Sequence, residues 1–128
     1  MPSALRYSTV VTSIGPLLGE FLAERIIVLF NEDAPEELWE FAVIHRPDDT
    51  FEEVRPGDLV RFGSHDPIKV TAVGEVANKN IAALGHAVFK CNGNKEADLP
   101  GDVCLENVPL PQVEVGQAVH IEAGGSSG

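Results

Sequence analysis

The chain has 128 residues, 44% of them hydrophobic, which is enough for one domain with its own core. Nine Lys and Arg stand against 20 Asp and Glu, and the net charge of −11 excludes nucleic acid and anionic membrane surfaces as favoured partners. The same charge favours a basic protein partner. No apolar run approaches the roughly 20 residues that span a bilayer, and residues 1–11 lack a secretory-signal pattern, so we expect a cytoplasmic protein.

Short apolar runs separated by turn residues predict the elements in chain order. We expect strands over residues 7–12, 25–30, 41–44, 59–62, 68–73, 87–91, 103–105 and 118–121. Helical turns are predicted over 17–24, 35–40 and 77–84, the last ending at Gly85 as a C-terminal cap. Residues 46–50 are predicted to form a polar loop. We expect a single domain over residues 1–123 and a flexible Gly/Ser tail over 124–128.

A short pattern occurs three times ahead of predicted strands. Residues 56–58 and 100–102 both read Pro-Gly-Asp before two apolar residues, and residues 115–117 repeat the shape as Val-Gly-Gln. Pro and Gly supply the backbone angles of a tight turn, after which the chain enters a strand. The pattern predicts short strands that meet at similar corners. We therefore expect a mainly β fold, a compact barrel or sandwich of short strands with one or two short helices.

Four histidines are the side chains whose charge changes near neutral pH. His45 stands where an apolar strand is predicted to emerge into a polar loop, so one ring nitrogen is expected to face outward. His65 lies on a predicted turn, and His86 follows Gly85 at a helix-to-strand junction. His120 alternates with apolar neighbours and is expected to face solvent. By position alone, an ordinary surface or hydrogen-bonded role is favoured over catalysis for each of these histidines.

Metal and nucleotide sites find little support in the sequence. The histidines lie at wide spacings without an H-x-x-x-H or Cys/His pattern, although a barrel can gather distant ligands. No phosphate-binding loop or nucleophile elbow is present. Cys91 and Cys104 lie in apolar runs and are predicted to be small core residues. A binding module that holds a metal or a small ligand in a β-barrel remains the alternative function.

Several segments together resemble the glucitol/sorbitol-specific enzyme IIA family of the sugar phosphotransferase system. These segments are residues 41–45 (FAVIH), 70–77 (VTAVGEVA), Asn80, 84–86 (LGH) and 94–101 (NKEADLPG). The resemblance covers about residues 9–122, which is most of the chain. The combination of VTAVG with LGH carries more weight than either piece alone.

The resemblance implies a phosphotransferase that relays a phosphoryl group through a phosphohistidine. The donor would be the histidine-containing phosphocarrier protein, and the acceptor a cysteine of the IIB component, which acts with the membrane component IIC. The family's acceptor histidine maps onto His45, whereas His65 and His86 are expected to be neighbours that stabilise the phosphate. No metal or cofactor is required, and the membrane is reached only through the transporter. A further residue should fix the tautomer of the His45 ring.

Overall fold

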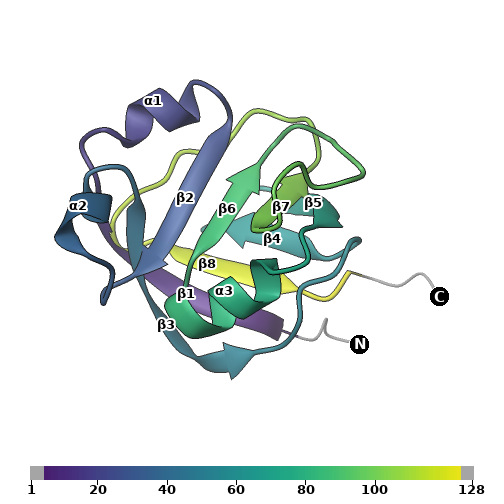
Figure 1. The fold of residues 1–128 in the computed structure, drawn as a ribbon, viewed down its shortest axis with the longest axis horizontal. Helices are drawn as coiled ribbons and strands as arrows, with labels where there is room; N and C mark the ends of the chain where they lie inside the picture. Colours follow the sequence, from purple (N-terminus) through teal and green to yellow (C-terminus); the bar gives the residue numbers. More distant parts are fainter. Residues whose placement is uncertain (1–4, 125–128) are drawn as a thin grey trace.

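The computed structural model describes residues 5–124, which form a closed barrel of eight strands with three short helices outside it (Figure 1). The strands are β1 (Leu5–Ile14), β2 (Ile26–Asn31), β3 (Val43–Phe51), β4 (Leu59–Phe62), β5 (Ile68–Val73), β6 (Ala87–Lys90), β7 (Asp102–Leu105) and β8 (Ala118–Glu122). The helices are α1 (Leu18–Leu22), α2 (Glu36–Trp39) and α3 (Ala77–Leu84). The expected mainly β class is confirmed as a barrel, with three helices rather than one or two. Residues 125–128 of the predicted tail lie outside the described residues.

Neighbouring strands in the barrel follow the order β1-β3-β2-β6-β7-β5-β4-β8, and β8 closes onto β1. Two pairs, β2 with β3 and β6 with β7, are parallel, and the other pairs are antiparallel. Parallel neighbours need a crossover connection. The connection from β2 to β3 contains α2, so this helix lies outside the barrel at the end of β2 (Figure 1).

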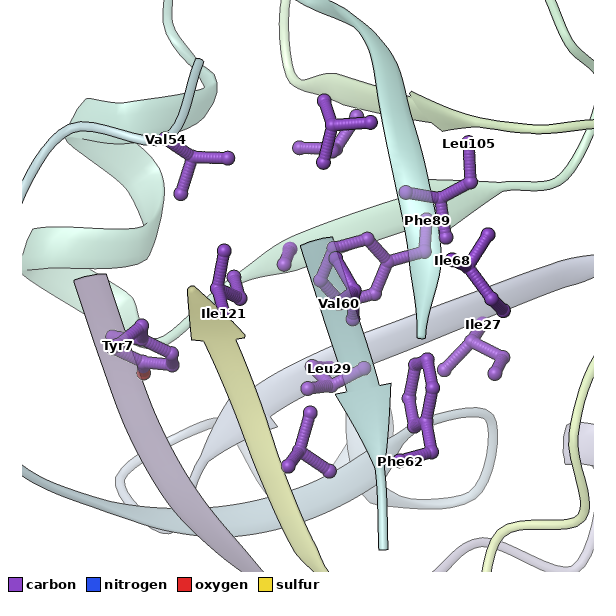
Figure 2. Packing of buried hydrophobic residues seen from close by; sticks show 14 of the residues in the cluster. Tyr7, Ile27, Leu29, Val54, Val60, Phe62, Ile68, Phe89, Leu105 and Ile121 are labelled. Carbon is purple, nitrogen blue, oxygen red and sulfur yellow. The ribbon is translucent and has the colours of Figure 1, made fainter. Parts of the chain in front are cut away.

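Alternating side chains fill the barrel. In β5, Ile68, Val70 and Ala72 are buried while Lys69 is exposed, as the period of two predicts. Residues from all eight strands meet in one core, which Figure 2 shows from close by. In its interior the rings of Phe62 and Phe89 pack edge to face, with centroids 6.0 Å apart. The core is therefore continuous and leaves the helices and connections to form the outer surface.

The three repeated turns share one hydrogen bond. Asp58 and Asp102 each accept the backbone N–H three residues earlier through Oδ2, at 2.7 and 3.2 Å, and the Gln117 side chain does the same through Oε1 at 3.4 Å. The two buried carboxylates also pair with cations, Arg6 at 3.0 Å and Lys90 at 2.8 Å. The repeated sequence pattern thus forms a turn of the same kind before β4, β7 and β8.

The prediction of a polar loop over residues 46–50 is wrong, because these residues belong to β3, which continues to Phe51. Arg46 and Pro47 pair with Val10 and Thr9 of the long strand β1. Pro47 has no N–H to donate, and it stands beside an irregularity in that pairing, where the loss of one ladder bond is tolerated. Pairing with β1 thus selects strand structure for a segment whose composition favours a loop.

Candidate functional site

His45 lies in the middle of the barrel wall, on β3 between β1 and β2. Its partners in the two ladders are Val11 and Asn31. The side chain is 0% exposed. Because β3 continues beyond it, the residue does not stand at the end of a strand. The expectation that one ring nitrogen faces outward is therefore wrong for this structure.

Both ring nitrogens of His45 have hydrogen-bond partners. Nε2 lies 2.7 Å from the carbonyl oxygen of Gly85, and Nδ1 lies 2.5 Å from Oγ1 of Thr9. A carbonyl oxygen only accepts, so Nε2 carries the proton and Nδ1 accepts the Thr9 hydroxyl proton. Thr9 is itself buried, so it is the residue that holds the ring's second nitrogen. Its hydroxyl can rotate and accept instead, and it therefore suits either neutral tautomer.

Burial lowers the pKa of His45 below its usual value, and the Gly85 carbonyl and the charge of Glu32 oppose that shift in part. The ring is accordingly neutral at physiological pH, the protonation state that a nucleophile requires. Glu32 forms a two-pronged ion pair with Arg46, at 2.8 and 3.1 Å. Hydrogen bonding to Arg46 lowers the pKa of Glu32, so the carboxylate stays charged near the site.

A thin cover separates His45 from solvent. Gly85 caps α3 in the left-handed conformation, at φ 59°, as predicted from the sequence. A Cβ at this position would lie 2.9 Å from Cβ of Asn31 and 3.1 Å from Nε2 of His45. Only glycine allows this close approach. The preceding residue, Leu84, is 50% exposed, so the segment that covers Nε2 reaches solvent directly beside Gly85.

His86 follows the cover and is more accessible. It is half-buried, its ring stacks on Phe30 with centroids 4.1 Å apart, and its Nδ1 lies 3.3 Å from the carbonyl oxygen of Leu29. The Gly85 backbone therefore has His45 on one side and His86 next in sequence. The structure places these two histidines at the same end of α3.

The other two histidines stand apart from His45. His65 is exposed in the turn between β4 and β5, and no hydrogen bond, ion pair or ring contact among residues 5–124 joins it to His45. The expectation that it belongs to the site finds no support in these contacts. His120 is half-buried and alternates with the buried Val119 and Ile121, so it points away from the core.

Metal ligation and thiol chemistry are not favoured either. Within the described part of the chain, no three His, Cys, Asp or Glu side chains group as metal ligands would. Cys91 and Cys104 are free and buried, as predicted. Burial raises the pKa of Cys91 to about 11, which keeps it a thiol rather than a reactive thiolate.

Sequence reasoning missed Thr9 and Tyr7. Tyr7 packs edge-on against the His45 ring, with centroids 6.1 Å apart, and its buried hydroxyl has no hydrogen-bond partner among the described residues. Both residues alternate with exposed or half-buried positions of β1, which marks them as inward-facing. Nothing in the sequence connects them with a histidine more than 30 positions away.

The fold is similar to a solved structure, "The Crystal Structure of PTS System IIA Component from Enterococcus faecalis V583", where PTS stands for phosphotransferase system. The TM-score is 0.74 and the identity 25%, and the match covers 88% of this chain and 96% of that chain. The likeness of the barrel to this structure indicates the class of IIA components of the phosphotransferase system.

The sequence comparisons narrow this class to one family. The model of the "PTS system glucitol/sorbitol-specific IIA component" matches residues 6–120. The glucitol/sorbitol-specific EIIA components of Shigella flexneri and Escherichia coli (strain K12) are each 32% identical over 117 residues, which covers 91% of this chain and 94% of each relative. The chain belongs to the glucitol/sorbitol-specific IIA family, and the resemblance found in the sequence is confirmed. No helix among residues 5–124 is long and apolar enough to cross a membrane.

Proposed function

We propose that this chain is a phosphoryl carrier of a glucitol/sorbitol-type phosphotransferase system. It accepts the phosphoryl group from the histidine-containing phosphocarrier protein and passes it to the cysteine of a IIB component, which acts with IIC at the membrane. It works in the cytoplasm and requires no cofactor. The observation that carries the proposal is the family match over residues 6–120.

His45 is the proposed acceptor, through Nε2. In the structure described above this nitrogen is protonated and covered, so transfer requires two changes: the Gly85 carbonyl moves away, and the ring proton shifts to Nδ1. Thr9 supports the second change, because its hydroxyl can accept from Nδ1–H as readily as it donates to Nδ1. The N–P bond of the donor then breaks as the bond to Nε2 forms, and the proton lost by the acceptor ring is taken up by the donor ring.

His86 is proposed to hydrogen-bond the phosphoryl group once it is on His45. The support is its position directly after Gly85 and its half-buried ring, which stacks on Phe30. Positioning and charge stabilisation are the main demands of phosphoryl transfer, so one imidazole and nearby backbone N–H groups suffice. His65 lacks such contacts, and it serves as the matched control histidine.

The test is incubation with the phosphorylated carrier protein, followed by mass spectrometry under conditions that preserve phosphohistidine. We expect one added phosphoryl group on the wild type, none on His45→Ala, slower labelling of His86→Ala, and unchanged labelling of His65→Ala. A phosphoryl group mapped to His86 would overturn the choice of acceptor and keep the carrier function. Stoichiometric bound metal without any labelling would instead favour the metal-binding alternative.

A further inference from the structure

A groove of about 260 Å³ lies between α2 and the C-terminal end of α3. Its lining is largely apolar and includes Phe30, Pro35, Leu38, Ala83 and Leu84. Leu38 and Leu84 are 37% and 50% exposed, so both leucine side chains of the groove are accessible to a partner. We call this feature the α2–α3 groove.

The α2–α3 groove adjoins the proposed acceptor. Leu84 precedes Gly85, whose carbonyl oxygen covers Nε2 of His45, and Asn31, which also lines the groove, pairs with His45 in the β2–β3 ladder. Phe30 forms another part of the lining and stacks on His86. A molecule bound in this groove therefore touches the segment that must move before His45 can react.

The side of the groove formed by α2 is acidic, because Asp33 lines the groove and Glu36 and Glu37 lie in the first turn of α2. Residues 31–45 contain five acidic residues, which are Glu32, Asp33, Glu36, Glu37 and Glu40; Arg46 offsets the charge of Glu32 and leaves the other four. Glu36 and Glu37 are exposed. An apolar floor with an acidic rim complements a protein surface in which apolar side chains are bordered by Lys and Arg.

We infer that the α2–α3 groove is the docking site of the phosphoryl-donor protein, which enters it with an apolar patch bordered by basic side chains. This inference rests on the proposed function. It assigns the apolar contacts to Leu38 and Leu84 and the long-range attraction to the acids of α2. Binding there would also act directly on the Leu84–Gly85 cover.

The first test removes the apolar contacts. We expect Leu38→Ser/Leu84→Ser to lower the transfer rate at low concentrations of phosphorylated carrier by about tenfold or more, as loss of two interface anchors does. The matched control is Leu99→Ser, a more exposed leucine (58%) that lines a separate hollow beside β5. Its rate should stay within about twofold of wild type.

The second test reverses charge on the surface of α2 and does not depend on the first variant. Glu36→Lys/Glu37→Lys should slow transfer at low salt, and the difference from wild type should shrink as salt screens the attraction. Glu75→Lys/Glu96→Lys, which changes two acids of the hollow beside β5, is the control of equal charge. Circular dichroism of every variant verifies that the barrel remains folded.

The outcomes separate the inference from the function on which it rests. If each groove variant transfers at the rate of its control, the docking site is overturned while the carrier function stands. If the wild type takes up no phosphoryl group from the carrier, the proposed function fails, and the docking inference fails with it. Selective slowing of both groove variants supports the inference.

Discussion

The hydrogen bond between Thr9 and His45 gives the most direct test of the site's architecture. Thr9→Val keeps the shape of the side chain and removes its hydroxyl, so Nδ1 of His45 loses the one hydrogen-bond partner that it has among residues 5–124. Thr9 is 2% exposed and His45 0%, so water cannot replace the bond. An unsatisfied buried polar atom of this kind costs about 1–3 kcal/mol of unfolding free energy.

This cost converts into a measurable melting shift. At about 2.1 cal/mol/K per residue, the unfolding entropy of a 128-residue chain is about 0.27 kcal/mol/K at the midpoint of thermal unfolding. Thr9→Val should therefore lower Tm by about 4–11 °C. The same variant should also slow phosphoryl uptake, because the Nδ1–H tautomer that transfer requires would lose the hydroxyl that accepts its proton.

Thermal and urea unfolding followed by circular dichroism measure this effect. Thr12→Val is the matched control, since Thr12 lies on the same strand and its hydroxyl makes a longer, 3.3 Å bond to Ile44 at a partly exposed position. We expect that control to cost about 0.5 kcal/mol. Equal losses for the two variants would refute the assignment of Thr9 as the residue that holds the ring.

Three further predictions concern stability. Because the pKa of His45 is lowered in the folded protein, the unfolded chain binds this proton more readily. The contribution of His45 to the unfolding free energy is therefore intact above about pH 6.5 and declines below it, by at most about 1.4 kcal/mol per pH unit. His45→Gln should flatten that part of the stability profile measured by urea unfolding, and an unchanged slope would contradict a buried neutral ring. Tyr7→Phe should raise stability by about 1 kcal/mol, because it removes an unsatisfied buried hydroxyl, whereas a lower Tm would reveal a bonded one. Asp102→Ala should cost about 3 kcal/mol, because Lys90 and a backbone N–H lose their partner, while the exposed Asp98→Ala should change stability by less than about 0.5 kcal/mol.

Local patterns predicted most of the barrel. The alternation in β5, the apolar run of β2 and the glycine cap of α3 each depend on residues close in sequence, and all three appear in the structure. The Pro-Gly-Asp echo also predicted its corners, although the shared side-chain bond to the backbone N–H three residues earlier was visible only in the structure.

The surroundings of His45 could not be predicted in the same way. The ring is buried because pairing with β1 keeps β3 in strand structure beyond His45, and because Gly85 covers Nε2. These contacts link His45 to residues that are 34 and 40 positions away in the sequence. A Pro-Asp-Asp sequence after a histidine favours a loop when only local propensity is considered. Strand pairing overrides that propensity here, and the histidine lies inside the wall rather than at its rim.

Closure of the barrel also limits how the protein can recognise other molecules. Because β8 pairs with β1, the barrel formed by residues 5–124 has no edge strand, although some strand ends have one partner only: β3 pairs with β2 at residues 43–45 and beyond them with β1 alone. Recognition by adding a partner's strand along a whole sheet edge is therefore disfavoured in this part of the chain. Specificity must come from side chains presented by the outer helices and connections, which can change in sequence without disturbing the ladder of hydrogen bonds beneath them.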